Sequence, residues 1–183
     1  DVAVAGGADS GVSPVLVGGF GTLGALSTRN DTPETACRPF SADRDGFVLG
    51  EGAGVVILES ESSARSRGAH VLARILGYGR SSDAYHITQP NEEGLGAARA
   101  MRFALASAGL EPSRLDHVSA HGTGTLLNDI SEARAIRTVF GSSVDRLPVS
   151  SLKGQVGHAI GASGAIALIA CVQAMGCDLS LIH

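Results

Sequence analysis

The sequence has no tryptophan, few aromatic residues and only three cysteines among its 183 residues. The irregular spacing of the cysteines forms neither a disulfide framework nor a zinc-ligand pattern, and it favours a reducing cytoplasm. A net charge of −4 at pH 7 leaves no unbalanced stripe of lysine and arginine, which argues against nucleic-acid binding. No signal peptide is visible and no apolar run approaches the length of a membrane span; residues 159–175 predict a buried helix broken by glycines.

The chain is instead rich in small apolar residues: 44% is hydrophobic, and its 25 glycines gather in clusters without a repeat. Strand-like runs alternate with helical ones, which is typical of an α/β layered fold. We expect strands at residues 2–5, 55–59, 71–78, 117–120 and 147–150, the first two buried, and helices after Ser13-Pro14 and at 60–67, 96–108, 131–140 and 161–175. Both ends fall in apolar, strand-like runs, which predicts a piece of a larger protein.

One glycine pattern matches the dinucleotide-binding fingerprint without its structural context. Gly19 to Gly24 reads G-x-G-x-x-G, but Pro33 and Pro39 interrupt the helix and strand that should follow it. We therefore disfavour a nucleotide site there. Residues 28–45 predict a polar loop, and Cys37 within it is interpreted as a bystander because no histidine is near it in sequence.

Two stretches place ionisable residues at the ends of predicted strands. His121 ends the first strand, and a tight turn with Thr123 and Thr125 follows it. Asp129 and Glu132 have capping-box spacing, so we expect the next helix to begin at Asp129.

The second stretch, residues 149–158, carries Lys153 and His158 on a glycine-rich turn. Active residues in α/β sheets gather beyond the carboxyl ends of strands, so His121 and His158 could converge there. Two neutral imidazoles would offer two N–H donors to one carbonyl oxygen, and Lys153 would add positive charge or orient a histidine. This pattern favours an enzyme that acts on a carbonyl or thioester, although no activated nucleophile is visible. His117 and His121 stand four apart on a strand without a nearby carboxylate or thiolate, which argues against a metal site.

The motifs along the chain resemble, in order, those of the β-ketoacyl-acyl carrier protein synthases, condensing enzymes of the thiolase superfamily. The resemblance covers nearly the whole chain and matches the C-terminal half to two-thirds of such an enzyme. The matching motifs are Val4-Ala5-Gly6-Gly7-Ala8, Leu26-Ser27-Thr28-Arg29-Asn30, Arg38-Pro39-Phe40, residues 45–54, Ser81-Ser82-Asp83-Ala84-Tyr85-His86, Ala120-His121-Gly122-Thr123-Gly124-Thr125, Lys153 and Gly157-His158.

The resemblance implies a layered αβαβα fold of two related halves. Residues 1–45 would end the N-terminal half, and residues 46–183 would form the C-terminal half. It also implies a dimer and an acyl carrier protein partner whose phosphopantetheine presents acyl and malonyl groups. Malonyl decarboxylation would yield an enolate that attacks an enzyme-bound acyl thioester in a Claisen condensation, without a cofactor or metal.

The resemblance also implies the roles of individual residues. His121 and His158 would stabilise the oxyanion, and Lys153 matches the family's active-site lysine. Asp129 and Glu132 match an acidic pair, with Thr123 and Thr125 in support, and Phe20 matches a residue near the acyl pocket.

The chain departs from the family pattern at several points. The family's nucleophilic cysteine lies upstream of Val2, and Cys37, Cys171 and Cys177 match no such position, so we expect this chain alone to be inactive. A connection of a dozen or more residues is expected between Met175 and Gly176, which predicts a gap or deletion there. Ala167 stands where elongating enzymes commonly have glutamate, which leans toward a polyketide-type enzyme, and Asn128 stands in place of a usual glycine.

Two other functions remain open on sequence grounds. A non-catalytic partner subunit, similar to a chain-length factor, would form a heterodimer with a ketosynthase, although such a subunit need not keep both His121 and His158. A thiolase that acts on coenzyme A esters is disfavoured by the form of the sequence after His121.

Overall fold

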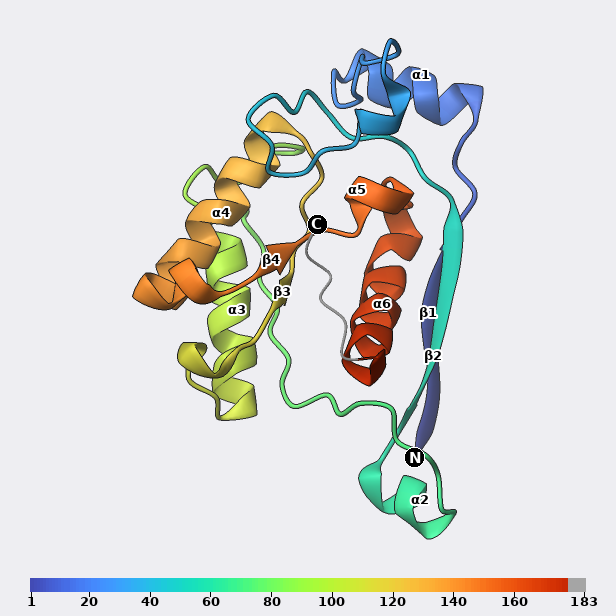
Figure 1. The fold of residues 1–183 in the computed structure, drawn as a ribbon, viewed down its shortest axis with the longest axis vertical. Helices are drawn as coiled ribbons and strands as arrows, with labels where there is room; N and C mark the ends of the chain where they lie inside the picture. Colours follow the sequence, from blue (N-terminus) through green and yellow to red (C-terminus); the bar gives the residue numbers. More distant parts are fainter. Residues whose placement is uncertain (178–183) are drawn as a thin grey trace.

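The computed structural model describes residues 1–177, and its elements lie in successive layers (Figure 1). One outer layer is an antiparallel sheet of β1 (Val2–Asp9) and β2 (Gly52–Glu59). Helix α6 (Ser163–Cys177) packs against this sheet and separates it from the parallel pair β3 (Val118–Ser119) and β4 (Val149–Ser150). The alternating layers of strand and helix agree with the α/β layered fold expected from the sequence.

Helices α3 (Leu95–Ala108) and α4 (Leu126–Phe140) pack together and cover the far side of β3 and β4. Helices α1 (Pro14–Thr22) and α2 (Glu61–Ser66) lie at opposite ends of the molecule (Figure 1). Short 3₁₀ turns occur at Pro33–Thr35, Pro112–Arg114, Gly141–Arg146 and Ile160–Ala162. The buried core lies between α4, α3 and the β3–β4 pair, and it consists of Ile136, Phe140 and Leu147 with Met101, Leu115, Val118, Val139, Val144 and Val149 packed around them.

Two glycines let the chain around α6 approach the β1–β2 sheet closely. A Cβ atom at Gly7 would lie 2.3 Å from the carbonyl oxygen of Gly161, and one at Gly54 would lie 3.1 Å from the carbonyl carbon of Ala165. Side chains at these positions would therefore separate the layers.

The predicted strands at 2–5 and 55–59 are confirmed, but the expectation that they are buried is wrong. Val4 and Ile57 are cross-strand partners, and they are 73% and 59% exposed. Because successive side chains of a strand point to opposite faces, these two lie on the face turned away from α6. That face remains open in the part of the chain that the structure describes.

Residues 71–78 do not form the expected strand. The segment is extended but has no ladder partner among residues 1–177, and Leu72 is 68% exposed. It passes close to α3, where a Cβ at Gly77 would lie 2.3 Å from the carbonyl oxygen of Ala104. Local β-propensity was therefore insufficient, since a strand also needs the hydrogen bonds of a neighbour.

The start of α1 and the end of α3 follow their sequence signals. Ser13 is the N-cap of α1, and its hydroxyl accepts a hydrogen bond from the backbone of Leu16 at 3.5 Å. Gly109 adopts the left-handed conformation after α3, with φ of 65°. Gly19 and Gly21 lie inside α1, so the G-x-G-x-x-G pattern forms helix rather than a phosphate-binding turn.

Helix α6 differs from its expected character in two respects. The segment Ile160–Cys177 is long and apolar enough, by length and composition, to cross a membrane, so the expectation that no apolar run approaches that length is wrong. It is only partly buried, yet it packs as a layer against β1 and β2. The helix also runs unbroken across Met175 and Gly176, and the remainder of the strand-like run expected at the C-terminal end, residues 178–183, lies outside the described residues. The missing connection near 175–176 stays a prediction.

Candidate active site

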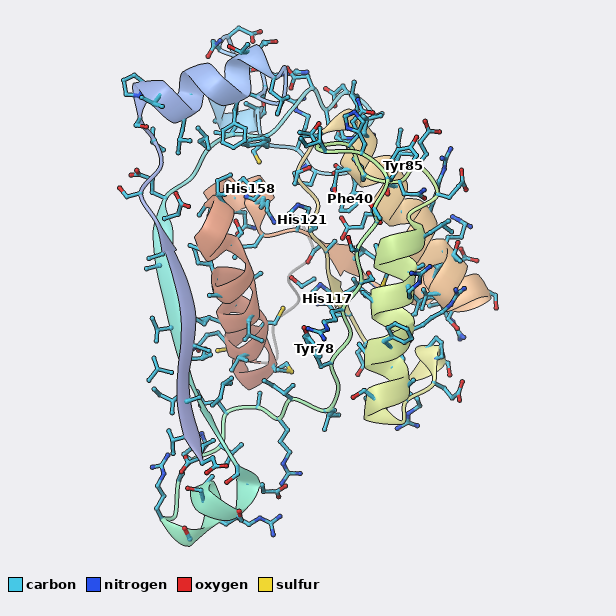
Figure 2. The ribbon with its side chains drawn as sticks, turned by 180° about the vertical axis from the view of Figure 1, so that it is seen from behind. Phe40, Tyr78, Tyr85, His117, His121 and His158 are labelled. Carbon is cyan, nitrogen blue, oxygen red and sulfur yellow. The ribbon has the colours of Figure 1, made fainter. Side chains whose placement is uncertain are left out.

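The structure brings the two candidate histidines face to edge. The ring centroids of His121 and His158 lie 5.4 Å apart with an interplanar angle of 83° (Figure 2). His121 follows β3, and His158 follows α5 (Lys153–Val156) after Gly157, whose φ of 73° turns the chain. Two segments far apart in the sequence thereby bring their imidazoles into contact.

The backbone of His158 is held by the segment that precedes β2. Its N–H donates to the carbonyl oxygen of Val48 at 2.7 Å, and its carbonyl oxygen accepts from the N–H of Gly50 at 3.0 Å. This short parallel bridge, centred on Leu49, fixes the strand end that carries the imidazole.

Two carboxylates hold the loop that carries His121. Glu132 accepts hydrogen bonds at 2.7 Å from the backbone N–H groups of both His121 and Gly122. Asp129 accepts from the N–H groups of Thr123 and Gly124 at 3.1 and 3.2 Å. Four consecutive N–H groups are thereby satisfied by side chains of a single helix.

This arrangement corrects the expected start of the helix. Helix α4 begins at Leu126, and Thr125 is in the N-cap position, although its side chain makes no capping hydrogen bond. Asp129 is thus inside the first turn instead of at the N-cap. The capping-box spacing was interpreted wrongly. Both carboxylates accept hydrogen bonds from backbone N–H groups of the preceding loop, and these groups compete with the helix N-terminus for the carboxylates.

Asp129 also ties the loop to residues far away in the sequence. Its carboxylate is buried, accepts a hydrogen bond from the backbone of Phe40 at 2.7 Å, and lies 3.5 Å from Nε of Arg44. Arg44 Nε in turn donates to the carbonyl oxygen of Thr125 at 3.1 Å. The hydroxyls of Thr125 and Thr123 lie 2.9 Å apart, which places both threonines in the same network.

Lys153 acts on the backbone of His121 rather than on its ring. Nζ donates to the carbonyl oxygen of His121 at 2.6 Å, and the lysine is buried. Ser151 donates to the neighbouring carbonyl oxygen of Gly122 at 2.7 Å. Burial lowers the pKa of Lys153, while the charge of Glu132 raises it. The sequence led us to expect that Lys153 either adds positive charge or orients a histidine. Its hydrogen bond to the backbone of His121 matches the second role.

Both imidazoles are shifted toward the neutral form. Burial, followed by the charge of Lys153, lowers the pKa of His121. The same two causes, with a contribution from His121, lower the pKa of His158 to about 4. Each ring therefore has one N–H donor and one bare nitrogen near neutral pH.

Aromatic rings extend from His158 toward Phe20. Phe47 packs edge-to-face on His158 with centroids 5.2 Å apart, and Phe20 packs on Phe47 at the same distance. Phe20 is thereby linked to His158 through the ring of Phe47. Phe47 is buried; no role was predicted for it from the sequence, where it is one residue of a motif that carries the family resemblance.

Cys37 and His117 lie apart from the imidazole pair. The Cys37 thiol donates to the carbonyl oxygen of Lys153 at 2.8 Å, and burial raises its pKa, which disfavours a thiolate. Nε2 of His117 lies 2.8 Å from the hydroxyl of Ser150. Residues 1–177 hold no cluster of three or more metal-ligating side chains.

A cavity of about 500 Å³ lies between the 37–41 loop, the β3–β4 pair and α6. Ala167, which stands where a glutamate is common in the resembling family, lines this cavity with Gln155. Neither His121 nor His158 is among the residues that line it.

Comparisons with known proteins show which family the chain resembles over most of its length. The model of the beta-ketoacyl synthase N-terminal domain matches residues 1–64, and that of the C-terminal domain matches residues 72–179. The chain is 48% identical over 169 residues to 3-oxoacyl-[acyl-carrier-protein] synthase 2 of Staphylococcus aureus, which covers 92% of this chain and 42% of that protein. The protein of the same name from Rhizobium meliloti (strain 1021) is 49% identical over 92% of this chain and 40% of its own length.

Solved structures give the same result. A beta-ketoacyl synthase from Burkholderia phymatum STM815 superposes with a TM-score of 0.90 at 44% identity, over 97% of this chain and 42% of that one. A ketosynthase solved with its type II polyketide synthase acyl-carrier protein matches with a TM-score of 0.90 at 41% identity, over 95% and 43%. The ishigamide ketosynthase/chain length factor matches with a TM-score of 0.84 at 43% identity, over 95% and 40%. The chain thus spans about two fifths of the length of these relatives.

Proposed function

The chain belongs to the beta-ketoacyl synthase family, and on that premise we propose that the protein it comes from condenses acyl groups with malonyl units. The similar structures are ketosynthases of the thiolase fold, so the layered αβαβα fold expected from the sequence is confirmed as a partial one. The single observation that carries the proposal is the pair of neutral imidazoles, His121 and His158, held 5.4 Å apart on rigid supports. The division of the chain at residues 45 and 46 stays a prediction.

The proposed reaction needs stabilisation of negative charge more than it needs a strong base. The bond between the malonyl α-carbon and its carboxylate breaks, carbon dioxide leaves, and the electron pair becomes an enolate with charge on the thioester oxygen. N–H groups of His121 and His158 donate to that oxygen, and preorganised donors of this kind lower the barrier. The enolate carbon then attacks the acyl thioester, and the acyl-carrying thiolate leaves with its electron pair. The resemblance places that thiolate upstream of Val2.

Lys153 and the two carboxylates serve as positioning groups in this proposal. The positive charge of Lys153 helps to hold the pKa of each imidazole below its usual range, so both rings keep a bare nitrogen and one donor. The hydrogen bonds that Asp129 and Glu132 accept restrain the backbone of the loop that carries His121. The ring of His121 therefore needs little reorganisation during the reaction.

We further propose an acyl carrier protein as the partner that delivers the malonyl and acyl groups, and a homodimer or ketosynthase heterodimer in the cytoplasm as the working form. A similar ketosynthase is known with its acyl-carrier protein, and others with chain length factors. Phe20 lies one ring beyond Phe47 from His158, a position that supports its proposed place beside the acyl chain.

The test measures carbon dioxide release from malonyl-acyl carrier protein by the whole protein, because this step is separate from acyl transfer. We expect His121→Gln and His158→Gln each to lower kcat by about 10²- to 10³-fold, the usual effect of removing one oxyanion donor. His70→Gln is the matched control, since His70 is exposed and has no contact with the site. Native rates in both site variants would contradict the proposal.

A non-catalytic partner subunit is the second candidate, because similar structures include ketosynthase and chain length factor assemblies. The intact imidazole pair weighs against it. A whole protein that releases no carbon dioxide alone but restores activity to a purified ketosynthase subunit would favour this alternative.

A further inference from the structure

The hydroxyl of Ser163 contacts one of the two ring nitrogens of His158. The other ring nitrogen is the one that would donate to the oxyanion in the proposed reaction. Oγ of Ser163 lies 3.0 Å from Nδ1 of His158. Ser163 is the first residue of α6, so its position is set by the helix that packs on the β1–β2 sheet. Phe47 packs on the same imidazole edge-to-face, which restrains the ring.

The direction of this hydrogen bond follows from the partners available to Ser163. In helices, serine hydroxyls commonly donate to the carbonyl oxygen four residues earlier, but within residues 1–177 the hydroxyl of Ser163 makes no such bond to Ala159 and instead contacts His158. Within residues 1–177 the hydroxyl of Ser163 has one hydrogen-bonding partner, Nδ1 of His158. If Nδ1 carried the proton, the serine would accept and its own hydrogen would have no acceptor in the described chain. Donation from Ser163 satisfies both groups.

We propose that Ser163 is a positioning residue that fixes His158 as the tautomer with its proton on Nε2. A neutral imidazole has one N–H, so a bare Nδ1 that accepts from Ser163 leaves the proton on Nε2. Nε2 is then the donor for the thioester oxygen. The tautomer assignment rests on the contact itself, and its catalytic meaning rests on the proposed function.

The test records nitrogen NMR spectra of the whole protein labelled with ¹⁵N-histidine. Nδ1 and Nε2 give separate signals when protonated and when bare, and His158→Gln identifies the His158 signals by their loss. We expect protonated Nε2 in the native protein and a mixture of tautomers in Ser163→Ala. Ser163→Thr, which keeps the hydroxyl, should restore the native pattern. Gly164→Ala is the matched control, because a Cβ there meets no atom within 4 Å.

Kinetics provide a second readout. Ser163→Ala should lower kcat for malonyl decarboxylation by about 2- to 13-fold, the range for one neutral hydrogen bond, with KM unchanged. Ser163→Thr should recover the rate. Ser163→Cys, which keeps a weak donor of similar size, should fall between them and replaces the alanine variant if that one does not fold.

The outcomes separate this inference from the proposed function. Native His158 with its proton on Nδ1, or an unchanged tautomer in both Ser163→Ala and Ser163→Cys, overturns the inference. A native protein that releases no carbon dioxide but shows the tautomer change would refute the proposed function while supporting the assignment of Ser163.

Discussion

Replacing Asp129 with asparagine should destabilise the protein strongly. The Asp129 side chain is 1% exposed and lies 3.5 Å from Arg44, whose side chain is 10% exposed. Its carboxylate accepts backbone N–H groups from Phe40, Thr123 and Gly124. In Asp129→Asn an NH₂ group takes the place of one oxygen, so at least one buried backbone donor loses its acceptor and Arg44 loses its counter-charge.

The expected loss is about 3–5 kcal/mol of unfolding free energy, the cost of removing one partner of a buried ion pair. The lost hydrogen bonds to a charged acceptor, about 1.5–3 kcal/mol each, overlap with that figure and are not added to it. Urea unfolding at constant m value measures the loss. Asp116→Asn, at an exposed position, is the control and should stay within about 0.5 kcal/mol of the native protein.

A second variant tests the physical reason. Arg44→Met combined with Asp129→Asn removes the uncompensated charge, so the double variant should lose less than the sum of the single variants. A loss below about 1 kcal/mol in Asp129→Asn, or strict additivity in the double variant, would refute the reasoning.

Three further predictions follow from the site. The pKa of His158 falls to about 4 on folding, so between about pH 6.5 and 4 the unfolded chain binds more protons than the folded one. The free energy of unfolding should therefore fall as the pH is lowered through this window, and it should fall less in His158→Gln. Lys153→Met removes a positive charge, so the pKa of both His121 and His158 should rise in an NMR titration, and unchanged values would contradict the assigned cause. Gly50→Ala puts a Cβ 2.3 Å from the carbonyl oxygen of Val156, which should cost about 1–3 kcal/mol in urea unfolding. Gly18→Ala is the control: it lies in open space inside α1 and should not destabilise the protein, since alanine favours a helix over glycine by up to about 1 kcal/mol.

The sequence predicts local structure where a single residue sets the backbone. Ser13 begins α1 and Gly109 follows the end of α3 as expected, because caps and left-handed glycines depend on few neighbours. Residues 71–78 were wrongly predicted to form a strand. A strand depends on pairing with a second strand, and the local sequence pattern does not show whether such a partner is present. The exposure of Val4 has the same origin, since burial depends on what covers a face.

For the site, spacing and resemblance identified the ionisable residues but not their supports. His121, His158 and Lys153 were expected to converge because each lies near a strand end, and the structure places them together. Arg44 was missed because it reaches the site through a tertiary contact, and Ser163 because its contact with His158, five residues before it, depends on the backbone turn between them. Asp129 was recognised, but its preference for the loop over the helix N-terminus depends on backbone geometry that spacing does not reveal.

The loop after β3 has a consequence for engineering. Its N–H groups from His121 to Gly124 are bound by carboxylates that follow within residues 121–132. The backbone is therefore saturated and cannot itself serve as an anion cradle, so the donors left for a substrate are side chains. The loop and the two carboxylates that bind it, those of Asp129 and Glu132, form one continuous segment. This segment could therefore be transplanted into another scaffold as a unit, provided that the host supplies cations in the places of Arg44 and Lys153. His158 cannot be transplanted in this way, because only Ser163 is near it in sequence and its other supports come from the distant segment 47–50.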